Sequence, residues 1–282
     1  MKKVIIVAMD FSEGAIDALK FAIVTANAIH ANIMMVWVDK KKLSSTVYSN
    51  ASDPRLEVKK RFEHLIAENT DEFTGGKFLY KMRNGRVFKE VTNQAKYHDA
   101  YMIIAGTHGT SGFDEFWMGS NAYKVVAHAE CPVLTLRNFD GLNKNISKIL
   151  LPIDSTRETR QKVSFTCFLA KQLDAEVVVL SVYSSKVDTI KMLVDNYAQQ
   201  AAKYCEENEV KFSLDSIEAE NITNCTIEFA KDNNIDIISI MTDQESAPMN
   251  LFLGPYAQQM VNHSPIPVLS IRSKNIYDYK LK

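Results

Sequence analysis

The sequence contains one structural pattern twice, and this duplication limits what the chain can fold into. An apolar run that ends in an acid, Val4–Asp10, recurs as Ile146–Asp154. The likeness is closest near the end of each copy, where Leu253–His263 aligns with Met118–His128. An internal repeat of this length indicates tandem domains. The length of 282 residues also fits two domains better than one, because single α/β domains usually have about 100–150 residues.

Within each copy, short apolar runs alternate with longer segments of helical periodicity. Runs such as Val4–Met9 and Tyr101–Ala105 are apolar at nearly every position, which is typical of strands buried on both faces of a parallel sheet. After the first run, Ser12–Ala28 has apolar residues at helical spacing, with Ser12 as the expected N-cap. The alternation predicts an α/β fold of two tandem doubly wound domains, each a Rossmann-like five-stranded parallel sheet flanked by helices.

Polar segments mark the boundaries of these domains. We expect the first domain to span residues 1–138 and the second residues 146–273, joined by the polar linker 139–145. Residues 274–282 form a C-terminal tail to which the sequence assigns no role. A further polar stretch, 40–54, is either a loop beside a ligand site or a solvated linker.

Three glycines, Gly106, Gly109 and Gly119, follow the apolar run Tyr101–Ala105. A glycine directly after a buried strand lets the backbone turn sharply and lets a ligand approach where a Cβ would block it. Ser120 opens an amphipathic helix, whose free backbone N–H groups favour an anion together with the serine hydroxyl. Strand, glycine loop and helix start therefore predict a phosphate cradle.

The spacing G-x2-G-x9-G-S, with its apolar flanks, resembles the ATP-binding motif of the universal stress protein family. It differs from the Walker A pattern, because no Gly-Lys-Ser/Thr follows the glycines, and from the G-x-G-x-x-G dinucleotide fingerprint. The resemblance covers nearly the whole chain, strongly in residues 1–138 and as a degenerate copy in 145–272. It implies an adenine nucleotide alpha hydrolase-like fold and ATP as the ligand, with Mg²⁺ as an optional companion.

The resemblance also implies which residues bind the nucleotide. Asp10 would hydrogen-bond the adenine, and a backbone group of Val38 would help to hold the base. The glycine loop, with Ser120 and Asn121, would hold the ribose and the phosphates. The full set of implied nucleotide-binding residues is Met9, Asp10, Val38, Gly106, Thr107, His108, Gly109, Gly119, Ser120 and Asn121. The sequence assigns no catalytic residue and no metal ligand.

Topology gives an independent reason to bring two of these residues together. In a doubly wound sheet, the carboxyl ends of strands one and four lie side by side at the switch point, where ligands bind. We therefore expect Asp10 and Gly106 to converge despite their separation in the sequence. Two alternatives stay open: Asp10 as the N-cap of the following helix, and His108 as a solvated side chain rather than a phosphate contact.

The second copy lacks most of the glycine motif. In the same register, Gly106, Gly109 and Ser120 are replaced by Met241, Gln244 and Pro255. A methionine side chain would occupy space that a ribose or phosphate needs, and proline offers neither an N–H nor a hydroxyl. Asp154 keeps the acid, but an acid alone cannot hold a triphosphate. We expect ATP in the first domain only, and a second domain that has kept the fold without the ATP site.

Composition excludes several classes of partner. Apolar residues at 46% and charged residues at 24% are ordinary for a globular protein. The net charge of −1 argues against nucleic-acid binding, which needs a clustered positive surface. No apolar run approaches the roughly 20 residues of a membrane span, and the first run meets Asp10 too soon for a signal peptide, so we expect a cytoplasmic protein. The four cysteines lack metal-ligand spacing and are expected to be buried filler rather than disulfides.

The last strands of the two domains indicate how the chain assembles. In the family that the chain resembles, the last strand of one domain pairs with that of another to form a dimer. Here Val133–Arg137 and Val268–Arg272 belong to one polypeptide and are expected to pair internally, which would cover two open edges. We also expect the whole chain to form a homodimer and to act on regulatory protein partners that the sequence does not identify.

These observations favour a nucleotide-dependent stress-response regulator over an enzyme. Phosphoryl transfer needs positioned cations and a group that orients the nucleophile, and beyond the cradle no base, arginine finger or acid cluster stands out in the sequence. A weak ATPase and a nucleotide-independent interaction scaffold are the alternatives. A scaffold would have no reason to keep Gly106 and Gly109 in the first copy alone.

Overall fold

The computed structural model describes residues 3–39, 54–107, 120–137, 145–242 and 253–273. The elements of the first half are β1 (Val4–Ala8), α1 (Glu13–Ile29), β2 (Asn32–Asp39), α2 (Pro54–Asn69), β3 (Phe78–Asn84), α3 (Val87–Tyr97), β4 (Met102–Gly106), α4 (Ser120–His128) and β5 (Val133–Leu136). Those of the second half are β6 (Lys148–Ile153), the 3₁₀ helix η1 (Arg157–Lys162), α5 (Val163–Leu173), β7 (Glu176–Tyr183), α6 (Asp188–Glu207), β8 (Phe212–Glu218), α7 (Ile222–Asp232), β9 (Ile237–Met241), α8 (Pro255–His263) and β10 (Val268–Ile271). Both halves follow the predicted alternation, and among the described residues only η1 has no counterpart in the first half.

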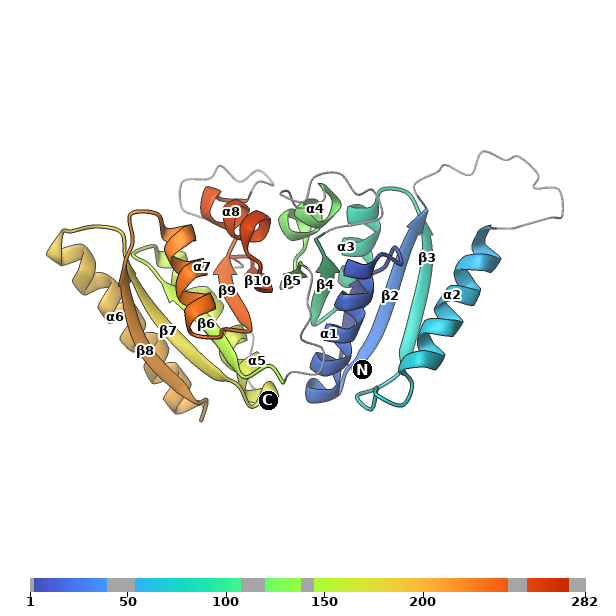
Figure 1. Cartoon of the computed structure of the whole chain (residues 1–282), viewed down its shortest axis with the longest axis horizontal. Coiled ribbons are helices and arrows are strands. Elements are labelled where there is room, and N and C mark those ends of the chain that lie inside the picture. Colours follow the sequence, from blue (N-terminus) through green and yellow to red (C-terminus); the bar gives the residue numbers. More distant parts are fainter. Residues whose placement is uncertain (1–2, 40–53, 108–119, 138–144, 243–252, 274–282) are drawn as a thin grey trace.

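All of these strands belong to a single ten-stranded sheet (Figure 1). Its order is β3-β2-β1-β4-β5-β10-β9-β6-β7-β8. Within each half, neighbouring strands are parallel, and the order of the strands reverses between β1 and β4 and again between β6 and β9. This is the doubly wound topology, so the predicted fold class is confirmed.

The two halves meet where β5 pairs with β10 in the antiparallel direction (Figure 1). Leu134 lies opposite Leu269, and both side chains are completely buried. Arg137 adds a contact beside the strands, because its Nη1 donates to the carbonyl oxygen of Asn262 at 3.2 Å. The predicted internal pairing is confirmed, and each half covers an edge strand of the other.

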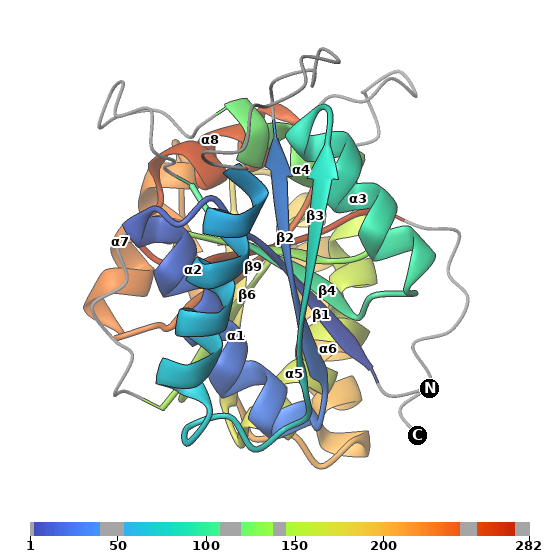
Figure 2. The same ribbon diagram turned by 90° about the vertical axis from the view of Figure 1, so that its right-hand side faces the viewer.

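Two layers of helices cover the sheet (Figure 2). Side chains alternate between the two faces of each strand, so Ile5 points into the layer that holds Leu19 of α1, and Ile6 points into the layer that holds Val125 of α4. Helices α2, α5 and α6 share the first layer, and α3, α7 and α8 share the second. No helix in the described ranges is long and apolar enough to cross a membrane.

The cysteines match the expectation only in part. None of the four cysteines is in a disulfide, but Cys131 and Cys225 are half-buried, whereas Cys167 and Cys205 are completely buried. The two buried Sγ atoms lie 3.2 Å apart, one from α5 and one from α6. The hydrogen bond between them raises the pKa of Cys167 and lowers that of Cys205. No spacing in the sequence predicts this pair, because it forms only when two separate helices pack on the same face of the sheet.

Candidate functional site

The switch point of the first half lies at the carboxyl ends of β1 and β4, as predicted. These strands are neighbours in the sheet, with Val7 opposite Ile104. Asp10 follows β1 and Gly106 ends β4, so the chain leaves both strands at the same edge. Because ligands of open α/β sheets bind at this edge, the structure brings Asp10 and Gly106 to the expected place.

Asp10 organises the turn into α1. One carboxylate oxygen, Oδ1, accepts the backbone N–H of Ser12 at 3.0 Å and its hydroxyl at 2.5 Å. Ser12 is itself the N-cap of α1, because its Oγ accepts the N–H of Ala15 at 3.3 Å. The alternative that Asp10 caps the helix is therefore wrong, while the predicted capping by Ser12 is confirmed. Asp10 is exposed, and its second carboxylate oxygen makes no hydrogen bond within the described residues.

Strand β2 extends beyond the end of β1 and leaves backbone groups facing the crevice. The two strands pair as far as Ala8 opposite Val36, and the Met9 N–H donates to the Val36 oxygen at 2.9 Å. Backbone groups along a strand face its two neighbours alternately, so Val38 turns its N–H and C=O toward the side of β1, past the point where β1 ends. The side chain of Met9 is buried in the core on the α1 face.

The structure gives a reason for Gly106 that the sequence did not suggest. Its backbone does not adopt a left-handed conformation, so the chain does not need a glycine there to turn. A Cβ at this position would instead lie 2.5 Å from both the carbonyl carbon and the oxygen of Gly14, in the first turn of α1. The glycine therefore allows α1 to approach the end of β4, and its predicted contact with a ligand stays a prediction.

The other predicted residues of the first half divide into two groups. The N–H of Thr107 donates to the Leu136 oxygen at 2.9 Å, so this amide already has a partner inside the sheet. Asn121 is half-buried in the first turn of α4. The remaining members of the set, His108, Gly109, Gly119 and the side chain of Ser120, lie outside the described residues, and their roles stay predictions.

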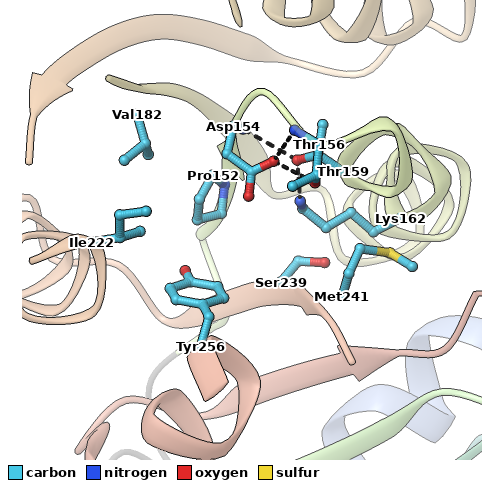
Figure 3. A pocket seen from close by; sticks show the side chains of 10 residues that line it. All are labelled: Pro152, Asp154, Thr156, Thr159, Lys162, Val182, Ile222, Ser239, Met241 and Tyr256. Carbon is cyan, nitrogen blue, oxygen red and sulfur yellow. Dashed lines mark hydrogen bonds between the residues drawn. The ribbon is translucent and has the colours of Figure 1, made fainter. Parts of the chain in front are cut away.

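The second half repeats the acidic turn of the first. Asp154 follows β6, and its Oδ1 accepts the backbone N–H of Thr156 at 2.8 Å and its hydroxyl at 2.6 Å. Beyond this turn the two halves differ, because the chain continues as the 3₁₀ helix η1 rather than as an α-helix. Met241 ends β9 at the position of Gly106, and its side chain lines a pocket at this edge of the sheet (Figure 3).

Lys162 is a residue of this pocket that sequence reasoning missed. It is only 4% exposed, and its Nζ donates to Thr159 Oγ1 at 2.9 Å. Burial lowers the pKa of the ammonium to about 8, although the negative charge of Asp154 opposes this shift. Burying a charge with so little compensation costs stability, which makes Lys162 a candidate for function.

A sequence signal for Lys162 did exist. The helix that follows the acid ends in a left-handed residue in both halves, His30 in the first and Asp174 in the second, at the same spacing from the acid. The two helices therefore align without a gap, and Lys162 takes the position of Ala18, which is completely buried. A lysine in the register of a core alanine could have been noticed from the alignment of the two copies.

Tyr256 is the second functional candidate that the sequence did not indicate. It stands in α8 at the position of Asn121, and its hydroxyl is buried with no hydrogen-bond partner in the described part of the chain. Burial raises the pKa of this phenol well above its usual range, and the nearby Thr226 side chain opposes part of this shift. Figure 3 shows the Tyr256 hydroxyl on the side of the pocket that faces Asp154 and Ile222.

Comparison with known proteins shows which family the chain is similar to. A family model described as the universal stress protein family matches residues 1–137 and 145–272. Universal stress protein YxiE of Bacillus subtilis (strain 168) is 30% identical over 144 residues, which are 47% of this chain and 97% of that protein. A universal stress protein of Thermus aquaticus is 30% identical over 140 residues, 49% of this chain and all of that protein. Each of these relatives therefore spans about half of this chain.

The solved structures include one that covers both halves. A universal stress protein from Archaeoglobus fulgidus DSM 4304 has a TM-score of 0.73, and the match covers 95% of this chain and 98% of that protein. The two sequences are 16% identical, so this likeness shows a common fold.

Proposed function

Because the chain belongs to the universal stress protein family, we propose that it is an ATP-binding stress-response regulator whose nucleotide occupies the first half alone. The observation that carries this proposal is the contrast between the halves at equivalent edges of the sheet. The first half keeps the complete glycine motif, whereas the second half has Met241 and Pro255 in place of Gly106 and Ser120.

Several groups of the first half are suited to a nucleotide. The open carboxylate oxygen of Asp10 can accept a hydrogen bond from the adenine amino group. The backbone N–H and C=O of Val38 face the same edge and can pair with the polar rim of the base. Helix α4 begins at Ser120, and the partial positive charge of a helix N-terminus favours phosphate groups. These contacts support ATP as the ligand, with Mg²⁺ bound to the phosphates when present.

We infer that the nucleotide acts as a signal rather than as a substrate. The residues proposed for the site bind and orient ATP, and none of them has an assigned role in activating water. Helix α4 leads directly into β5, which pairs with β10 of the second half. A nucleotide at the start of α4 would therefore act close to the junction of the two halves. We place this function in the cytoplasm and in a homodimer of the whole chain.

The test is to identify and count the bound nucleotide. Protein purified without added nucleotide is denatured, and any released ligand is identified by chromatography and mass spectrometry. Protein stripped of ligand is then titrated with ATP by calorimetry, with and without Mg²⁺, while phosphate release is measured in the same sample. We expect one ATP per chain and no sustained turnover. Two sites per chain, no binding, or steady phosphate release would each contradict the proposal.

A pair of variants assigns the site to the first half. Gly109→Val should reduce ATP affinity by at least about 100-fold, because a branched side chain would block the approach of the phosphates to the backbone. The matched control is Gln244→Val, the same substitution at the equivalent position of the second half, which should leave ATP binding unchanged. Circular dichroism shows whether both variants remain folded. Equal affinity in the two variants would remove the assignment.

A further inference from the structure

The pocket of the second half has a polar side and an apolar side (Figure 3). Asp154, Thr159 and Lys162 gather on one side, and Val182 and Ile222 lie opposite them. The cavity volume is about 20 Å³. A cavity of this size holds about one water molecule, which the head group of a small molecule can replace.

Several hydrogen-bond donors of the pocket have no acceptor within the described residues. The ammonium of Lys162 has three N–H donors, and within the described residues one of them is used, on Thr159 Oγ1. Thr159 Oγ1 already accepts two hydrogen bonds, from Lys162 Nζ and from the Asp154 N–H at 3.3 Å, so its own hydroxyl hydrogen is left to donate. The buried hydroxyl of Tyr256 is a further donor. A group rich in acceptor oxygens would satisfy these donors together.

Charge and shape narrow the class of ligand. Lys162 carries the positive charge of the pocket, and Asp154 places one negative charge beside it. An incoming dianion would meet that carboxylate with a single cation to balance both, so a monoanion is favoured over a dianion. The apolar wall of Pro152, Val182 and Ile222 can hold a short hydrocarbon chain but offers no side-chain hydrogen bonds.

We propose that this pocket binds a small monocarboxylic acid, with the carboxylate on Lys162, Thr159 and Tyr256 and a short apolar chain against Val182 and Ile222. The site is distinct from the ATP site proposed for the first half, and it does not depend on that proposal. It gives the second half a ligand of its own in the crevice where the glycine motif has been lost.

The test is thermal unfolding of the full chain, followed by circular dichroism, in sodium butyrate and in sodium chloride at equal ionic strength. With a Kd of about 1 mM, 20 mM butyrate should raise the Tm by about 4–7 °C over the chloride control. Butyramide has the same shape without the charge and should have no effect. An equal rise with butyramide, no rise with butyrate, or a larger rise with inorganic phosphate would overturn the assignment.

Variants tie the response to the pocket. Lys162→Met should abolish the butyrate response, and the matched control Lys171→Met, at an exposed lysine of α5, should keep it. Tyr256→Phe removes only the hydroxyl and should weaken butyrate binding several-fold, which keeps the proposal testable if Lys162→Met does not fold. Gly109→Val should keep the full response, because it changes only the first half. A full response in both Lys162→Met and Tyr256→Phe would contradict the proposal.

Discussion

The two halves enter their crevices by the same turn and then differ within a few residues. Asp10 and Asp154 hold the turn in the same way, each through the N–H and hydroxyl of the residue two positions later. In the first half the chain continues as the α-helix α1, and in the second as the 3₁₀ helix η1. The acid and its turn are therefore part of the scaffold that the two halves share.

The difference is explained by how closely a helix can approach a strand end. In the first half Gly106 lets the end of β4 approach the backbone carbonyl group of Gly14 in α1. The second half has Glu158 and Met241 at these positions, and such close contact is no longer open to it. Its chain starts with a 3₁₀ segment instead, and Lys162 enters at the position of Ala18. Substitutions at a few packed positions thus give the same edge of the sheet a different site in each half.

The strongest test of this comparison is to remove the glycine contact. Gly106→Ala should lower the free energy of unfolding of the first half by about 2–3 kcal/mol, because the added Cβ would lie 2.5 Å from the backbone of Gly14. Urea unfolding can be followed by tryptophan fluorescence, since both tryptophans, Trp37 and Trp117, belong to the first half. Met241→Leu, a volume-conserving change in the second half, should leave this transition in place. An unchanged midpoint in Gly106→Ala would show that the close approach is not what requires glycine.

The next effect is of opposite sign and concerns the buried lysine. Lys162→Met should raise the free energy of unfolding of the second half by about 1–3 kcal/mol at pH 7, because methionine fills a similar volume without the buried charge. The transition is followed by circular dichroism, since the second half has no tryptophan. Lys171→Met, which removes an exposed charge paired with Glu209, is the control and should change stability by less than about 1 kcal/mol.

The stability that Lys162→Met adds should depend on pH, and this dependence tests whether the buried charge is the cause. The pKa of Lys162 is about 8 in the folded chain, below the ordinary value of 10.5. The cost of burying the charge is therefore fully present below pH 8 and is relieved as the pH rises from about 8 through 10.5, because the folded chain loses its proton in this range before the unfolded chain does. The stability gap between Lys162→Met and the parent chain should shrink across this window. A gap that stays constant would mean that the charge is not the cause.

The smallest effect concerns the unpartnered phenol. Tyr256→Phe should raise the free energy of unfolding by about 1 kcal/mol, because it removes a buried hydroxyl without a partner in the described residues. Tyr183→Phe is the matched comparison, since the Tyr183 hydroxyl donates to Asp195, and its loss should be neutral or destabilising. Chemical denaturation measures both changes. A loss of stability in Tyr256→Phe would indicate that its hydroxyl is hydrogen-bonded in solution.

The sequence by itself determined the architecture of this protein. Apolar runs and helical periodicity placed the strands and helices, because burial on one or both faces leaves a direct trace in the order of side chains. The internal repeat indicated two halves, and Ser12 was recognised as an N-cap because capping depends on residues close in the chain. The pairing of β5 with β10 was expected from the family resemblance, because the last strands of two domains pair in that family and both last strands belong to one polypeptide here.

The tertiary structure alone decided the details of the two crevices. It showed that Gly106 is required by Gly14 and that the amide of Thr107 is already bound to Leu136. It also showed that Lys162 is buried beside Asp154. These facts depend on how closely separate elements approach and on which polar groups meet in the interior. Residue type and periodicity report which face is buried, but they do not carry the distances between segments far apart in the chain.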